Sequence, residues 1–170
     1  LTAMLIGLIF RGVAFEFRFK ATEEHRPFWD KSFIAGSLLA TFSQGVAVGA
    51  ILNGFPVVGR TYAGSAMSWL APFPLFCGVG LVIAYALLGS TWLIMKTEHQ
   101  LHRKMTALAL PLTLALLVVV GIISLWTPLT HNDIAHRWFS LPNLFWFLPV
   151  PRLVLLCSWG PIRAMKREAP

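Results

Sequence analysis

Long apolar runs, separated by short groups of charged or turn-forming residues, make up almost the whole chain. A helix needs about 20 apolar residues to cross the hydrocarbon core of a membrane. The first run meets a charge already at Arg11, so we expect a truncated helix there and an internal fragment of a longer chain over the 170 residues. The pattern predicts one truncated span at about 1–16 and four complete spans at about 33–53, 73–95, 105–127 and 142–163.

The composition of the chain is that of a membrane protein. Hydrophobic residues make up 56% of the chain, charged residues make up 12%, and the mean hydropathy is +0.69. These values exclude an ordinary soluble domain. We therefore predict the all-α class, as a polytopic transmembrane helix bundle in which residues 1–170 form a single transmembrane helical domain.

The segment at 33–53 has two features of a packed membrane helix. Gly45 and Gly49 show the GxxxG spacing, which lets two helix backbones approach closely in a membrane. Gln44, near the middle of the segment, is its one strongly polar side chain. We expect Gln44 either to form an interhelical hydrogen bond or to contribute to a proton path.

The last apolar segment, 142–163, is the least regular. Pro149 and Pro151 interrupt its middle, and Arg152 is the only basic residue deep inside an apolar run. A charge at the centre of a membrane costs about 2.5–3.5 kcal/mol on insertion scales, so it is usually paired or functional. Three roles for Arg152 follow: capping carbonyl groups freed by the prolines, pairing with a helix outside this fragment, or a direct role in function.

The basic residues alternate between the two ends of the predicted spans. Eleven of the 14 Lys and Arg residues lie in segments 11–31, 96–104 and 163–170, and the intervening connections contain only Arg60 and Arg137. By the positive-inside rule, the three basic segments face the cytoplasm. The net charge of +7 thus reflects topology and does not require nucleic acid as a partner.

The first run passes directly into a stretch of alternating charged residues and phenylalanines. If the helix continues, Arg11, Phe15 and Arg18 lie on one face, because they are spaced at i, i+4 and i+7. Glu16 and Lys20 have the spacing and order of a favourable ion pair on another face. The arginines are expected either to reach lipid phosphates as simple anchors or to belong to a functional charged cluster.

Candidate chemistry is sparse in this sequence. Haem iron needs axial His, Met, Cys or Tyr ligands, and no histidine lies in the middle of a predicted span. Cys77 and Cys157 occur singly on apolar segments, as packed thiols do. No metal-binding spacing, phosphate-binding glycine loop or nucleophile motif is present, so we expect this chain to bind no haem and no metal itself. The five histidines lie in predicted connections or near span ends: His25, His99, His102, His131 and His136.

Two long stretches give the chain a family resemblance. Residues 10–18 (FRGVAFEFR) and 78–98 (GVGLVIAYALLGSTWLIMKTE) resemble subunit II of the cytochrome bd-type ubiquinol oxidases, in the same order along the chain. The resemblance covers essentially all 170 residues. One departure is His99-Gln100-Leu101, which stands where relatives often have Gly-Glu-Leu, so a role for that acidic position does not carry over.

The resemblance implies a function in a respiratory chain. In that family quinol is oxidised, oxygen is reduced to water, and haem b and haem d belong to the partner subunit I. Subunit II packs against subunit I in the bacterial inner membrane, helps to bound the oxygen and proton routes, and sometimes accompanies a structural quinone or a small accessory subunit. Because residues 10–18 match the family, the resemblance implies a charged cluster near the cytoplasmic mouth of a proton path, with Arg11, Glu16 and Arg18 as its candidate residues.

A secondary transporter or permease is the alternative from a different functional class. It predicts an inverted repeat and broken helices that meet at the membrane midplane. The prolines at 149 and 151 resemble such a break, but no matching break and no repeat is found earlier in the sequence. Co-purification with a haem-bearing partner supports the oxidase, and substrate uptake by this chain alone supports the transporter.

Overall fold

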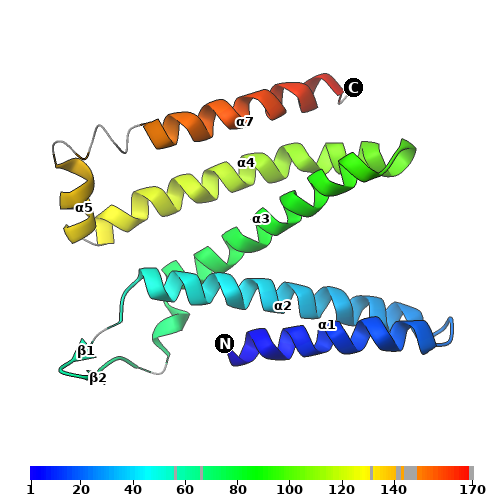
Figure 1. The fold of residues 1–170 in the computed structure, drawn as a ribbon, viewed down its shortest axis with the longest axis horizontal. Coiled ribbons are helices and arrows are strands. Elements are labelled where there is room, and N and C mark those ends of the chain that lie inside the picture. Colours follow the sequence, from blue (N-terminus) through cyan, green and yellow to red (C-terminus); the bar gives the residue numbers. More distant parts are fainter. Residues whose placement is uncertain (56, 66, 131, 141–142, 144–148, 169–170) are drawn as a thin grey trace. The chain divides into compact units, whose positions relative to one another are not determined.

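The computed structural model describes the whole chain except residues 56, 66, 131, 141–142, 144–148 and 169–170. It divides into two compact units, Leu1–Val82 and Ile83–Pro170, which are described separately below. The elements, shown in Figure 1, are α1 (Thr2–Lys20), α2 (Arg26–Leu52), β1 (Val57–Val58), β2 (Thr61–Tyr62), a 3-10 turn η1 (Ser68–Leu70), α3 (Pro72–Lys96), α4 (His99–Thr130), α5 (Asn132–Phe139) and α7 (Pro149–Glu168). Helix α3 begins in the first unit and ends in the second.

In the first unit, α1 and α2 form an antiparallel helical hairpin in which the two backbones touch (Figure 1). A Cβ atom added at Gly36 would lie 2.7 Å from the carbonyl oxygen of Gly7, and one added at Gly7 would lie 2.8 Å from the backbone nitrogen of Ala40. Only glycine leaves room for such a crossing. The α1–α2 contact is therefore made by backbone atoms at this point, with no layer of side chains between them.

The opposite end of α2 packs in the same way against the first part of α3. A Cβ atom at Gly45 would lie 2.7 Å from the Cα of Gly78, and one at Gly49 would lie 2.7 Å from the Cα of Pro74. The close approach predicted from the GxxxG spacing is confirmed, and its partner is α3. Packing at two ends makes α2 the central element of this unit.

A small β-hairpin and a 3-10 turn connect α2 to α3. Strands β1 and β2 pair antiparallel, with Val57 opposite Tyr62 and Val58 opposite Thr61. The two residues that join the strands are Gly59 and Arg60, and Gly59 has a φ of +64°, which favours glycine. The 3-10 turn η1 then leads into α3.

In the second unit, α4 is the longest helix, and both α5 and α7 pack against it. The turn from α3 into α4 is tight: His99 has a φ of +60°, and the ring Nδ1 of His102 donates a hydrogen bond of 3.1 Å to the carbonyl oxygen of Ile94. Buried hydroxyl groups on α4 are satisfied within the helix, since Thr106 and Thr113 each donate to the carbonyl four residues earlier.

The all-α architecture predicted from the sequence is confirmed. Among the described helices, α2, α3 and α4 are long and apolar enough to cross a membrane. Helix α3 covers the predicted range 73–95, whereas α1, α2 and α4 extend past their predicted ranges. Hydropathy marks only the part of a helix that suits the hydrocarbon core, and the backbone hydrogen bonds continue into the charged flanks. The segments 11–31 and 96–104, expected to be basic loops, are consequently mostly helical.

The interruption predicted at Pro149 and Pro151 coincides with the start of a helix. Helix α7 begins at Pro149, so both prolines lie in its first turn, where the missing backbone N–H has no intrahelical acceptor to lose. Much of the first part of the predicted span 142–163 falls on residues outside the described ones. The polar stretch at 130–140, expected to be a plain connection, contains the short helix α5.

Candidate functional site

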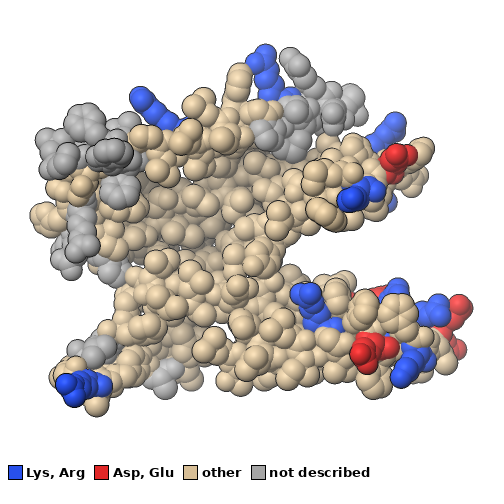
Figure 2. Space-filling model, viewed as in Figure 1, with Lys and Arg blue, Asp and Glu red and all other residues tan. Residues whose placement is uncertain are grey.

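Formal charges of both signs gather where α1 ends and α2 begins. Figure 2 shows Lys, Arg, Asp and Glu side chains around this end of the α1–α2 hairpin. Here called the charged end, it comprises the last turns of α1, the connection 21–25 and the first turns of α2. Its charged residues are Glu16, Arg18, Lys20, Glu23, Glu24, Arg26, Asp30 and Lys31.

An ion pair ties the two helices together at the charged end. The Nε of Arg18, on α1, donates a hydrogen bond to the Oδ1 of Asp30, on α2. Both side chains are about half exposed. The bond shows that Arg18 lies on the face of α1 that is turned towards α2.

Aromatic rings accompany this ion pair. The rings of Phe17 and Trp29, each next in sequence to a member of the pair, stack with centroids 5.1 Å apart and an interplanar angle of 30°. Trp29 also meets Phe28 edge to face at 5.2 Å. Such contacts contribute about 0.5–1.5 kcal/mol beyond burial of area, so the stacking reinforces the same pairing of helices.

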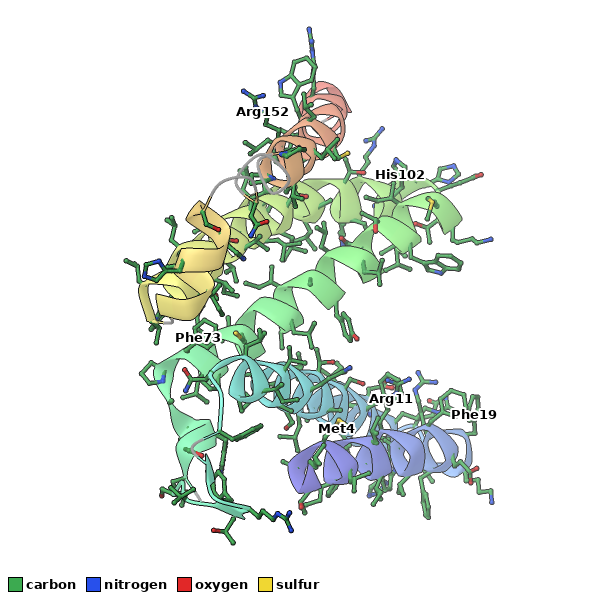
Figure 3. The ribbon with its side chains drawn as sticks, turned by 60° about the vertical axis from the view of Figure 1, so that its left-hand side comes forward. Met4, Arg11, Phe19, Phe73, His102 and Arg152 are labelled. Carbon is green, nitrogen blue, oxygen red and sulfur yellow. The ribbon has the colours of Figure 1, made fainter. Side chains whose placement is uncertain are left out.

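Arg11 lies two turns further from the connection and also turns towards α2. Its guanidinium carbon is 5.7 Å from the centre of the Phe33 ring, in the geometry of a cation–π contact. A Cβ atom at Gly36 would lie 3.0 Å from the backbone nitrogen of Arg11, so this residue sits beside the backbone crossing of the two helices (Figure 3). Arg11 and Arg18 therefore share the α2-facing side of α1, as their spacing predicts.

Glu16 does not join the two arginines. It is exposed on α1, and the ion pairs of the described residues are Arg18–Asp30 and the weaker Arg26–Glu23 at 3.6 Å. The Glu16–Lys20 pair expected from helical spacing is thus not formed within the described residues. The structure brings Arg11 and Arg18 to one interface and leaves the Glu16 carboxylate facing outwards.

The two intramembrane polar candidates are exposed. Gln44 lies on α2 and forms no hydrogen bond with any described residue, so the expected interhelical bond is not made within this hairpin. Arg152 lies in the first turn of α7, exposed, and belongs to neither of the ion pairs of the described residues (Figure 3).

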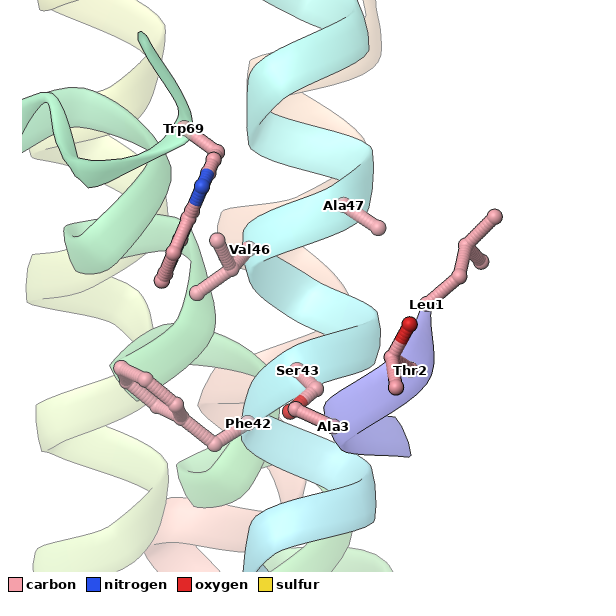
Figure 4. Close-up of a pocket in the computed structure, with 8 residues that line it drawn as sticks. All are labelled: Leu1, Thr2, Ala3, Phe42, Ser43, Val46, Ala47 and Trp69. Carbon is pink, nitrogen blue, oxygen red and sulfur yellow. The ribbon is translucent and has the colours of Figure 1, made fainter. Parts of the chain in front are cut away.

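An apolar pocket of about 380 Å³ opens between the start of α1, the middle of α2 and the connection to α3 (Figure 4). Its lining carries no titratable side chain, so it offers no acid–base group and suits an apolar molecule or chain. The lining residues are Leu1, Thr2, Ala3, Phe42, Ser43, Val46, Ala47 and Trp69.

Two of the described histidines form local hydrogen bonds through a ring nitrogen. His25 bonds through Nδ1 to the hydroxyl of Thr22 at 2.9 Å, and His102 uses Nδ1 for the Ile94 carbonyl. Both lie at helix ends, and no three His, Cys, Asp or Glu side chains gather into a metal site in the described part of the chain. That this chain itself binds no haem remains an expectation.

Sequence reasoning missed Asp30 and Phe33 as partners of the two arginines. Each contact crosses from α1 to α2, so it depends on how the hairpin is aligned, and periodicity within one helix carries no information about that alignment. One signal was available: the short connection 21–25 forces α1 and α2 to run antiparallel and places the first turns of α2 beside the last turns of α1.

Comparison with known proteins gives a consistent result. The family model for cytochrome bd terminal oxidase subunit II matches residues 1–170. Cytochrome bd-I ubiquinol oxidase subunit 2 of Escherichia coli K12 is 33% identical over 129 residues, which is 72% of this chain and 34% of that protein. A probable cytochrome oxidase subunit 2 of Haemophilus influenzae is 33% identical over 131 residues, covering 72% of this chain and 35% of its own length. The chain therefore spans about a third of the length of the curated relatives that it matches.

Proposed function

Because the chain belongs to the family of cytochrome bd terminal oxidase subunit II, we propose that the full-length protein is subunit II of a respiratory quinol:oxygen oxidoreductase. The observation that carries this proposal is the match of the family model over the whole chain, including both stretches that resemble the family. In the overall reaction, oxidation of two quinols releases the four electrons that reduce one oxygen molecule to water with four protons. The redox chemistry is supplied by haem b and haem d, which we assign to the partner subunit I.

The role proposed for this chain is to pack against subunit I in the bacterial inner membrane and to bound the oxygen and proton routes. Large apolar side chains are exposed along α1, α2, α3 and α4, as expected for helices that face lipid or another membrane subunit. The basic segments 11–31, 96–104 and 163–170 would face the cytoplasm. A quinone and a small accessory subunit are further proposed partners. Gln44 and Arg152, both exposed, are candidates for polar contacts with helices of the complete assembly.

At the charged end, we assign different tasks to Glu16 and to the two arginines. An arginine side chain stays protonated in proteins, so Arg11 and Arg18 cannot pass protons on. Both are held by α2, one by the Phe33 ring and the other by Asp30, and they place positive charge at fixed positions. The exposed Glu16 carboxylate can take up and release a proton. Glu16 would thus receive protons at the cytoplasmic mouth, in the field of the arginines.

Purification of the full-length protein with the product of its operon neighbour tests the subunit assignment. The expected result is a haem-bearing complex with a bd-type reduced-minus-oxidised spectrum and quinol-dependent oxygen consumption. A haem-free preparation that consumes no oxygen, or substrate uptake by this chain alone, would contradict it.

Substitution at the charged end tests the proton-path assignment. Glu16→Gln removes the exchangeable proton and keeps the shape, so turnover is expected to fall several-fold while the spectrum and the yield stay unchanged. Glu24→Gln, in the connection 21–25, is the matched control and should keep full turnover. Arg11→Leu should also lower turnover. If Glu16→Gln and Arg11→Leu assemble normally and turn over fully, the charged end is only an anchor.

A further inference from the structure

The connection between α2 and α3, residues 53–71, has a surface unlike that of an ordinary loop. We propose that this connection lies in the lipid interface, with its apolar side chains at the boundary between headgroups and acyl chains and Arg60 at the level of the lipid phosphates. The proposal requires only that the protein resides in a membrane, and it does not depend on the oxidase reaction.

Charge is almost absent from this part of the chain. Between Lys31 and Lys96, Arg60 is the only Lys, Arg, Asp or Glu residue, although this stretch includes a complete connection between two helices. A connection that stands in water is normally rich in polar residues, because its backbone and side chains are solvated there. Residues 53–71 include Asn, Thr, Ser and Gly, but they contain a single charged residue, Arg60.

Six of the side chains that this connection exposes are large and apolar or aromatic, and they lie among the exposed polar residues Arg60, Thr61, Ser65 and Ser68. Val58 is 70% exposed and Met67 is 63% exposed, the highest values among the described large apolar side chains of the connection. Aromatic side chains such as Trp and Tyr favour the region between hydrocarbon and water. The exposed set comprises Phe55, Val58, Tyr62, Met67, Trp69 and Leu70.

Several polar side chains in the described part of the connection bond to one another or to nearby carbonyl groups. The hydroxyl of Tyr62 lies 3.0 Å from the carbonyl oxygen of Ser65, to which it donates, and 2.7 Å from the hydroxyl of Ser68. Thr61 donates through its hydroxyl to the carbonyl of Val58 at 3.1 Å, and the backbone N–H of Met67 donates to the hydroxyl of Ser65 at 3.3 Å. A hydrogen bond left unmade is costly where water is scarce, and these contacts remove that cost.

The position of the connection between two helices and its single positive charge indicate that lipid covers it. The connection joins α2 and α3, which are both long and apolar enough to cross a membrane, so their ends lie at its surface. Its single cation lies in the turn between β1 and β2, and a lone arginine among apolar side chains matches an interface of anionic phosphates over acyl chains. A covering protein would have to supply a partner for Arg60 as well as an apolar surface.

Site-directed spin labelling of the full-length protein, with its co-purified subunits, tests this placement. Nitroxide labels are attached at Val58→Cys and at Met67→Cys, after Cys157 and other reactive cysteines have been replaced, and the protein is placed in nanodiscs of phosphatidylethanolamine and phosphatidylglycerol. Glu24→Cys, in the charged connection 21–25, is the control. Power saturation then measures how often each nitroxide collides with two reagents. Oxygen concentrates in the acyl region, and the nickel complex NiEDDA is soluble in water.

The expected result is a several-fold higher oxygen-to-nickel collision ratio at residues 58 and 67 than at residue 24. A nickel accessibility at 58 and 67 equal to that at 24 would place the connection in water and overturn the proposal. Low accessibility to both reagents, with an immobilised spectrum, would show a protein covering and would also overturn it. Because Met67 lies outside both strands, a disturbance of the hairpin by Val58→Cys leaves the second position informative.

Discussion

The two connections of the first unit lie at opposite ends of α2 and satisfy their polar groups in opposite ways. At the charged end, full charges pair across two helices, as in the bond between Arg18 and Asp30. In the connection 53–71, neutral hydroxyls bond to nearby carbonyls and to each other, as in the contacts of Tyr62. Helix α2, with 27 residues and a length of about 40 Å, separates the two.

The difference matches the surroundings proposed for the two ends of α2. Ion pairs that are half exposed tolerate water and salt and remain adjustable, which suits a surface where protons and ions arrive. Short hydroxyl-to-carbonyl bonds need no water, which suits a surface in contact with lipid. Both ends share one method of helix packing, because glycines bring α2 against α1 near one end and against α3 near the other.

Substitution of a glycine at which α2 packs against its neighbours should have the largest effect on the stability of the protein. Gly36→Ala would force a Cβ atom to within 2.7 Å of the Gly7 carbonyl oxygen, a backbone atom that cannot move aside by itself. Overpacking of this kind costs about 1–3 kcal/mol, and we expect a lower thermal midpoint and a lower yield of extracted protein. Both are measured by thermal unfolding in detergent and by quantitative purification.

Gly12→Ala is the matched control for this substitution. It lies on the same hairpin with no atom within 4 Å of the added Cβ, so it should be neutral or stabilising by up to about 1 kcal/mol from helix propensity. Equal unfolding midpoints for the Gly36 and Gly12 variants would show that the backbone crossing does not govern stability.

Removal of one hydroxyl should affect only the α2–α3 connection. Tyr62→Phe loses two hydrogen bonds at about 1 kcal/mol each, so amide exchange in residues 57–62 should accelerate about 5- to 30-fold. Tyr85→Phe, on an exposed part of α3, removes the other tyrosine hydroxyl of the chain and should leave exchange there unchanged. Unaltered protection in Tyr62→Phe would mean that the hydroxyl bonds contribute nothing to the order of this connection.

Loss of the ion pair between Arg18 and Asp30 should have the smallest effect on stability. A double-mutant cycle with Arg18→Gln and Asp30→Asn is expected to yield a coupling of about 0.2–1 kcal/mol, reduced by salt, because the pair is half exposed. The same cycle on Arg26 and Glu23, which are 3.6 Å apart and more exposed, should give a smaller coupling free energy. A coupling for Arg18 and Asp30 that exceeds this range and persists in high salt would mean that the pair is buried in the assembled complex.

Sequence periodicity predicted the features that depend on one helix at a time. The shared face of Arg11 and Arg18 follows from helical spacing alone, and both residues do contact α2. The spacing of Gly45 and Gly49 predicted a close neighbour, and α3 is that neighbour. The identity of each partner depends on tertiary alignment, so Asp30 and Phe33 could not be obtained in the same way.

One local expectation failed for a physical reason, and another is refined by the structure. Glu16 and Lys20 have the spacing of an ion pair, but such an exposed pair gains only a few tenths of a kcal/mol, too little to hold two side chains together. The prolines at 149 and 151 were expected to interrupt a span; proline can either interrupt a helix or begin one, and α7 begins at Pro149. Hydropathy cannot distinguish these two uses, because both occur in apolar sequence.

The backbone crossing at Gly7 and Gly36 has a mechanical consequence. Because the two backbones are in contact there, a roll of α1 that turned a neighbouring side chain towards α2 would cause a steric collision, so the glycines restrict the rotational setting of α1. The direction in which the Arg11 and Arg18 side chains leave α1 is therefore determined by two uncharged glycines. Electrostatic function at the membrane surface would then be sensitive to substitutions made well inside the bilayer.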